Sequence, residues 1–291
     1  LIGGFILVVN FSLVFVYQIT FSKNFLFLDI GSTNNLEIFS ILFLIYSFFF
    51  LGLCDDKYHL SPFKKLFLLI VLILITIFLN KRLILSDFAL SFYYSRIFFE
   101  NFSIIFTIFC ILTLTNALNF YDGINGQSCI IFLVFFSYLF LKSDLNFFYL
   151  ISFIFIFMVM MLNLKNLLFL GDSGIYLISS ILSISLIYEY NIHKSIHYAD
   201  EIFFLLLLPG LDLIRLTIIR IFHNKNIFYG DRNHIHHLIN KKFSLTNTNI
   251  ILFVLSVFPI ILFLYFSLNF FIVFIVFLVL YISIVVFFKK I

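Results

Sequence analysis

Long apolar runs divide the chain at regular intervals. Runs of roughly 15 to 20 apolar residues, the length of helix that crosses about 30 Å of hydrocarbon, occupy residues 2–20, 36–54, 63–80, 100–118, 128–141, 147–162, 175–190, 201–222, 250–267 and 270–288. The pattern predicts an all-α polytopic transmembrane bundle of about ten spans. Because no linker or soluble module interrupts it, residues 1–291 are predicted to form a single integral membrane domain.

Polar residues gather in four short clusters between these runs. The clusters are LGLCDD (51–56), NALNFYDGING (116–126), FLGDSG (169–174) and GDRNHIHH (230–237). An even number of predicted spans separates each cluster from the next, so all four are expected at one face of the membrane. That face carries twelve of the 18 Lys and Arg residues. Since cytoplasmic loops collect Lys and Arg, the clusters are predicted to be cytoplasmic.

Composition excludes a water-soluble domain. The chain is 63% hydrophobic and 11% charged, with a mean hydropathy of +1.18, which is far more apolar than a soluble protein. The predicted surrounding is therefore the lipid bilayer, and no nucleic-acid partner is predicted. The three cysteines have no metal-ligand spacing and are interpreted as small hydrophobic residues.

Two adjacent carboxylates, Asp55 and Asp56, are predicted at the interfacial end of the second span. A charge within a bilayer costs on the order of 3 kcal/mol or more on insertion scales. Such a pair is therefore expected where a cation or a reacting group needs it. A solvated helix end is the alternative.

Three polar residues recur at a spacing of three in the second cluster. Asn116, Asn119 and Asp122 should lie on one face of the last turns of a helix. Gly123 and Gly126 then let the backbone approach a ligand and offer N–H donors that suit phosphate. Helix capping by Asn and Gly is the alternative, but it explains only part of the cluster.

Asp172 lies between Gly171 and Gly174 at the start of the seventh span. A carboxylate in such a turn suits Mg²⁺, whose octahedron substrate phosphates and waters complete. The backbone N–H groups of the same turn are expected to bind phosphate. An Asp that only caps the helix is the alternative.

The fourth cluster places His234, His236 and His237 beside Arg232. Clustered imidazoles could bind zinc or, with basic residues, hold phosphate oxygens. Zinc would need further ligands, and the other two closely spaced histidines, His193 and His197, are predicted on the opposite side of the membrane. Anion binding is therefore favoured over zinc.

In their order and spacing, the clusters resemble the polyprenyl-phosphate N-acetylhexosamine-1-phosphate transferase superfamily, of the glycosyltransferase family 4 type. The segment LIGG resembles the end of its Pro-x-x-Gly-Gly segment. Asp55, Asp56, Ser61 and Pro62 match its double-Asp and Leu-Ser-Pro motif, and the second and third clusters match Asn-x-x-Asn-x-x-Asp-Gly-x-x-Gly and Phe-x-Gly-Asp-x-Gly. The family has eleven spans, so its first span and following loop are expected to be missing here.

The resemblance implies transfer of a sugar 1-phosphate from a UDP-sugar to polyprenyl (undecaprenyl) phosphate, with release of UMP and with Mg²⁺, or Mn²⁺, as cofactor. Such a reaction is the first membrane step of cell-wall or O-antigen lipopolysaccharide synthesis. It implies the bacterial inner membrane, with the site facing the cytoplasm, and it is compatible with a homodimer. Asp212, Arg215 and the HIHH tail resemble the GlcNAc-1-phosphate branch more than the phospho-MurNAc-pentapeptide translocase.

The resemblance also assigns roles to residues. It implies that Asp172 binds the metal, that Asp55 and Asp56 act on the lipid phosphate, and that Asp122 is a third catalytic carboxylate. The substrate-binding residues that it implies are Asn116 and Asn119 at the phosphate site, Asn125 and Phe169 near the uracil, and Arg232, His234, His236 and His237 on substrate phosphate.

The chain departs from the family pattern at three positions. Asn125, Gln127 and Ile175 stand where Asp, Leu and Ser are usual. A catalytically impaired or truncated relative is therefore one alternative. A transporter of lipid-linked or anionic substrates is another, but it would place its polar residues near the membrane midplane.

Overall fold

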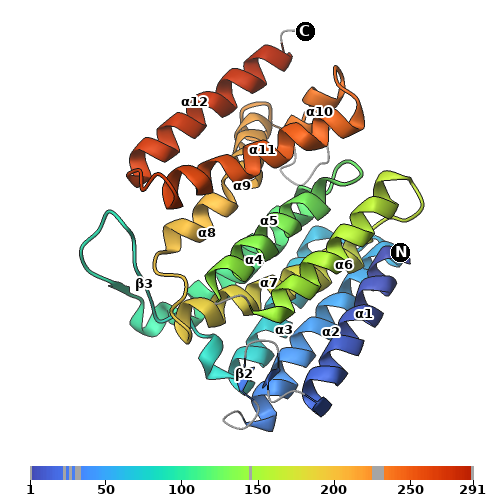
Figure 1. The fold of residues 1–291 in the computed structure, drawn as a ribbon, viewed down its shortest axis with the longest axis vertical. Helices are drawn as coiled ribbons and strands as arrows, with labels where there is room; N and C mark the ends of the chain where they lie inside the picture. The colour runs from blue at the N-terminus through green and yellow to red at the C-terminus, as the bar shows by residue number, and fades with distance from the viewer. Residues whose placement is uncertain are drawn as a thin grey trace.

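The computed structural model describes residues 2–21, 24–25, 28–29, 34–143, 146–224 and 233–289. These residues form a bundle of helices, shown in Figure 1. The helices are α1 (Ile2–Phe21), α2 (Asn35–Tyr58), α3 (Pro62–Leu79), α4 (Ser103–Phe120), α5 (Gln127–Lys142), α6 (Phe147–Leu164), α7 (Gly171–Asn191), α8 (Ala199–Leu205), α9 (Leu207–Phe222), α10 (Ile235–Asn240), α11 (Leu245–Leu264) and α12 (Phe270–Lys289). The fold is thus the predicted all-α membrane bundle.

The only strands in the described residues are two short hairpins. β1 (Asn24–Phe25) pairs with β2 (Leu28–Asp29), and β3 (Asp87–Phe88) pairs with β4 (Ile97–Phe98), both antiparallel. Single 3₁₀ turns at Lys81–Leu83 and Glu100–Phe102 flank the second hairpin. Both hairpins lie in connections between helices and contribute nothing to the spans.

Each predicted span corresponds to a helix, with two qualifications. Eight of the described helices are long and apolar enough to cross a membrane, and α5, with 16 residues, is shorter. The predicted span 201–222 is broken into α8 and α9, which meet at 67°. Pro209 explains the break, because proline lacks an N–H and its ring clashes with the carbonyl four residues earlier.

Helix α7 lies at the centre of the bundle. It packs against α1, α2 and α4, and all of its residues from Ser173 to Tyr190 are buried. Small residues let neighbouring backbones approach closely in membranes, and α7 carries Ser179, Ser180 and Ser183, whose hydroxyls donate to carbonyls of their own helix. The sequence of α7 therefore suits contact with protein rather than with lipid.

Candidate active site

Four polar segments meet at one end of the bundle. They are the ends of α2 and α4 with the residues that follow them, the turn from α6 into α7, and residues 233–237 at the start of α10 (Figure 1). Contacts join the segments, since Gly123 lies against the ring of His236 and Gly171 against the carboxylate of Asp56. The expectation that the clusters share one face is confirmed. That this face is cytoplasmic stays a prediction.

Glycines of α1 and α2 enclose the start of α7. A Cβ atom on Gly52 would lie 2.5 Å from the Cα atom of Ser173, and one on Gly4 would overlap the Ser173 hydroxyl. The backbone N–H of Gly3 donates to the carbonyl of Phe169 at 3.0 Å. Only glycine allows so close an approach. Gly3, Gly4 and Gly52 therefore hold the turn that precedes α7 and the start of that helix.

Asp56 caps the N-terminus of α7 from a different helix. Its Oδ1 accepts a hydrogen bond from the backbone N–H of Asp172 at 2.8 Å, and its Oδ2 accepts one from Ser173 at 3.1 Å. Gly171 has a φ of +69° and faces the same carboxylate. The expectation that these N–H groups bind phosphate was wrong, because Asp56 already occupies them. The positive end of the helix dipole favours this carboxylate.

Asp55 and Asp172 share a lysine. Lys65, near the start of α3, forms an ion pair with Oδ2 of Asp55, and its Nζ atom lies 3.6 Å from Oδ2 of Asp172. Asp55 is buried, and its Oδ1 accepts the backbone N–H of Leu60 at 2.9 Å. Two carboxylates from helices far apart in sequence thus converge on one cation.

The same oxygens fit a hard divalent cation. Mg²⁺ takes oxygen ligands and is usually held by one or two carboxylates, with waters and substrate phosphates in the remaining positions. Oxygens of Asp55 and Asp172 already surround one cation, the ammonium group of Lys65. Asp56 is less suited to bind a metal, because both of its oxygens accept backbone N–H groups.

The predicted polar face of α4 borders this group. Asn116 and Asn119 are half-buried in the last turns of α4, and their side chains make no hydrogen bond to any residue that the structure describes. Asp122 follows the helix, is exposed, and accepts the Ser128 hydroxyl at 2.5 Å. Asp56 is near enough to act electrostatically on Asp122. The two amides and Asp122 are therefore free to contact a ligand.

A second pair of loops is joined by amides. The side chain of Asn125 donates to that of Asn166 at 2.5 Å, and the backbone N–H of Gly126 donates to Asn163 at 2.5 Å. Phe169, in the same loop as Asn166, is 58% exposed. The structure thus brings the loop of Asn125 to the loop of Phe169, the two residues predicted near the uracil.

Asp212 of α9 connects three elements, because its carboxylate contacts α9, α12 and the histidine segment of residues 234–237. One of its oxygens, Oδ1, accepts hydrogen bonds from Arg215 at 2.7 Å, from the Tyr281 hydroxyl at 2.9 Å and from the backbone N–H of Ile235 at 3.2 Å. Its other oxygen lies 2.8 Å from Nδ1 of His234. Asp212 thus pairs with Arg215 and also orients His234.

His236 is the most deeply buried histidine of its cluster. Its ring is 1% exposed, stacks beside His234 with centroids 5.3 Å apart, and lies 4.3 Å from the ring of His237. Burial, with the charges of His237 and His234, lowers the pKa of His236 to about 3. It is therefore neutral near pH 7. Arg232 lies outside the described residues.

A metal at the histidines remains the alternative to anion binding. Ligand atoms of Asp212, His234 and His236 lie within 4.8 Å of one another. A zinc ion there, however, would sit beside the guanidinium of Arg215, which contacts the same carboxylate at 2.7 Å. The contacts of Asp212 therefore favour anion binding by the histidines.

The comparison with known families decides the identity. Residues 38–189 match Glycosyl transferase family 4. The chain belongs to this family. Membership supports the superfamily of polyprenyl-phosphate sugar-1-phosphate transferases and a phospho-sugar transferase activity. A comparison with curated proteins finds no match.

The family 4 match covers part of the candidate site. Eight predicted site residues lie within it, namely Asp55, Asp56, Asn116, Asn119, Asp122, Asn125, Phe169 and Asp172. The histidine cluster and Asp212 lie beyond it. Their connection to the family site is made by spatial contact, through Gly123 and His236.

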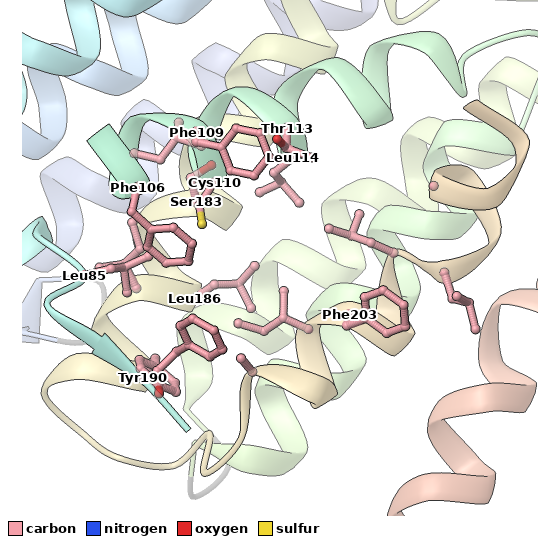
Figure 2. A pocket seen from close by; sticks show the side chains of 18 of the residues that line it. Leu85, Phe106, Phe109, Cys110, Thr113, Leu114, Ser183, Leu186, Tyr190 and Phe203 are labelled. Carbon is pink, nitrogen blue, oxygen red and sulfur yellow. The ribbon is translucent and has the colours of Figure 1, made fainter. Parts of the chain in front are cut away.

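This family 4 protein also has an apolar cavity of about 500 Å³. It lies between α4, α7, α8 and α9, and Figure 2 shows Phe109, Leu114 and Leu186 among its lining residues. The lining is almost entirely apolar. It reaches Leu114, two residues before Asn116, and Leu211, next to Asp212.

Lys65, Gln127 and Tyr281 contact site residues in the structure but were not predicted to belong to the site. Lys65 follows Asp55 and Asp56 closely in sequence, and its positive charge was the one feature that could have indicated an ion pair with them. Tyr281 lies in the most apolar span, α12, where its hydroxyl was the only sign of its contact with Asp212. Gln127 stood out only as a departure from the family pattern.

Proposed function

We propose that this protein transfers a sugar 1-phosphate from a UDP-sugar to polyprenyl phosphate and releases UMP. The proposed donor carries GlcNAc or a related HexNAc, and the proposed acceptor is undecaprenyl phosphate. One observation carries the proposal: the carboxylates of Asp55 and Asp172 converge on Lys65 at one end of a membrane bundle.

The reaction requires two anionic substrates to meet. An oxygen of the lipid phosphate attacks the phosphorus that bears the sugar, and the bond from that phosphorus to UMP breaks. Lys65 offsets part of the accumulating negative charge, as preorganised cations do at phosphoryl groups. Asp172, with Asp55, would hold Mg²⁺, which supplies further charge neutralisation when bound. Among the described residues, the amides of Asn116 and Asn119 have no hydrogen-bond partner, so they can donate to phosphate oxygens.

The apolar cavity supports a lipid acceptor. A polyprenyl tail needs an apolar path that ends at its phosphate, and the cavity runs from Leu85 and Tyr190 to Leu114 beside the polar end of α4. Leu114→Trp would fill this path and should raise KM for polyprenyl phosphate roughly tenfold, on the scale of a lost apolar contact, with KM for the UDP-sugar unchanged. Ile105→Trp, at an exposed position of the same helix, is the matched control.

Transfer itself is tested with purified protein, radiolabelled UDP-sugars and undecaprenyl phosphate. Label should enter a lipid-extractable product while UMP is released, and Asp55→Asn should lower the rate by at least about 10²-fold. Asp87→Asn removes a carboxylate that pairs with Arg96 away from the site and serves as the control. Uptake of label into vesicles without a lipid product would favour the transporter, and no turnover with any UDP-sugar would favour an impaired relative.

The proposed location is the bacterial inner membrane, with the site facing the cytoplasm. In a Cys54→Ala background, Lys165→Cys places a thiol at an exposed position between α6 and α7, and Tyr94→Cys places one at an exposed position between β3 and β4. An impermeant thiol reagent applied to cells or spheroplasts should label only the second. Labelling of the first without permeabilisation would reverse the orientation.

A further inference from the structure

Gln127 connects two parts of the site that are far apart in sequence. It is the first residue of α5 and is fully buried. Its Oε1 faces the backbone N–H of Gly123 at 3.4 Å, and its Nε2 lies 2.9 Å from Nδ1 of His236. It therefore joins the turn of residues 121–126 to the HIHH segment of residues 234–237.

The two contacts fix which way the amide points. The N–H of Gly123 can only donate, so the amide oxygen of Gln127 must face it and the amide NH₂ must face His236. An NH₂ group can only donate, so Nδ1 of His236 must be the acceptor. A neutral imidazole with a lone pair on Nδ1 carries its proton on Nε2.

The Nε2 atom of His236 points at the turn of residues 121–126. A Cβ atom on Gly123 would overlap it, so a glycine is required at this position. Among the described residues, Nε2 has no hydrogen-bond partner although it is buried. A buried donor without an acceptor is unfavourable, because it has lost its hydrogen bond to water without replacing it. The arrangement therefore suits a ligand oxygen that enters at the turn.

We propose that Gln127 is a positioning residue that holds His236 in the Nε2–H form and so presents a neutral hydrogen-bond donor to a phosphate oxygen of the substrate. The substrate part of this inference rests on the proposed function, whereas the tautomer does not. Besides Gln127 and Gly123, the described residues that act on the ring are Tyr121, His234, His237 and Asp212. Of these, His234 is held by Asp212, which leaves His236 to Gln127.

Two substitutions separate positioning from packing. Gln127→Glu keeps the shape and the acceptor for Gly123 but turns an acceptor towards Nδ1, so the ring must place a proton there. Gln127→Leu keeps much of the volume and removes both contacts. Asn249→Asp is the matched control. Asn249 is a buried amide that donates to the Asn125 carbonyl at 2.8 Å in the same turn, and it makes no hydrogen bond to a histidine in the part of the chain that the structure describes.

The test is ¹⁵N NMR of the full chain in detergent micelles, with labelled histidine and with His236 assigned by His236→Gln. Wild type and Asn249→Asp should both show a lone-pair-type Nδ1 and a protonated Nε2. Gln127→Glu should move Nδ1 to the protonated type, and Gln127→Leu should give a mixture of tautomers. A protonated Nδ1 in the wild type, or spectra that Gln127→Glu leaves unchanged, would overturn the proposal.

Activity is measured on the same samples. Both Gln127 variants should lower kcat/KM for the sugar phosphate donor about tenfold, the effect of one hydrogen bond of about 1.4 kcal/mol, with KM for the lipid acceptor unchanged. Unaltered kinetics despite altered tautomers would refute the role in substrate binding. A wild type that transfers no sugar phosphate, yet shows the expected tautomer, would contradict the proposed function instead.

Discussion

Replacement of Asp56 by Asn should lower the free energy of unfolding of the protein as well as inactivate it. The carboxylate accepts the N–H groups of both Asp172 and Ser173, at 2.8 and 3.1 Å. An asparagine has one acceptor oxygen, so it can keep one of these bonds and must direct its NH₂ group at the other N–H. The first turn of α7 is then left with an unpaired donor.

The magnitude follows from these two bonds. A hydrogen bond to a charged partner contributes about 1.5–3 kcal/mol, and a negative charge at a helix N-terminus adds about 0.3–1 kcal/mol. Asp56→Asn loses one such bond and the charge, so the free energy of unfolding should fall by roughly 2–4 kcal/mol. For a protein of 291 residues, that lowers the unfolding temperature by roughly 3–7 °C.

The assay is loss of helical circular dichroism on heating in detergent, together with transfer activity. Asp87→Asn is the control, because it removes a carboxylate whose ion pair with Arg96 is more exposed and lies away from the site. Asp56→Asn should lose at least about 10²-fold in rate as well as stability, whereas Asp87→Asn should keep both. Equal unfolding temperatures for Asp56→Asn and the wild type would refute the capping role.

Three further predictions test the rest of the site. Asp172→Asn should keep its helix content but transfer nothing at any Mg²⁺ concentration, and activity that returns at high Mg²⁺ would reduce Asp172 to tuning metal affinity. Burial and neighbouring charges lower the pKa of His236 to about 3. Below roughly pH 6.5 the ring therefore binds a proton in the unfolded protein but not in the folded one, so the free energy of unfolding should fall as the pH drops. A fall of equal size in His236→Gln would contradict this. Gly52→Ala places a methyl group 2.5 Å from the Cα atom of Ser173 and should cost roughly 1–3 kcal/mol of stability through overpacking, whereas Gly210→Ala, with nothing within 4 Å, should unfold at the wild-type temperature in the same melting experiment.

The helices could be predicted because each depends on a local property. An apolar run of sufficient length is almost obliged to be a helix in lipid, where backbone groups must be satisfied within the segment. The break between α8 and α9 could not be predicted in this way, since Pro209 lies inside a continuous apolar run and hydropathy does not register its missing N–H.

The site could be predicted only as far as its location. Counting spans placed Asp55, Asp172 and His236 at one face, because the count needs only the order of the helices. The contacts between them depend on how each helix is rotated and tilted, which the sequence pattern does not fix. The cap by Asp56 and the contact of Gln127 with His236 therefore became visible only in the structure.

The central position of α7 has a consequence for how the protein is made. With a mean hydropathy of 1.3, against 3.2 for α12, it is the least apolar of the eight long spans. Segments with serine, glycine and aspartate partition weakly into lipid during insertion. Helix α7 must therefore be retained by α1, α2 and α4, which are synthesised before it and pack against it. A defect in those helices would release α7 from the membrane and reverse the orientation of every span that follows.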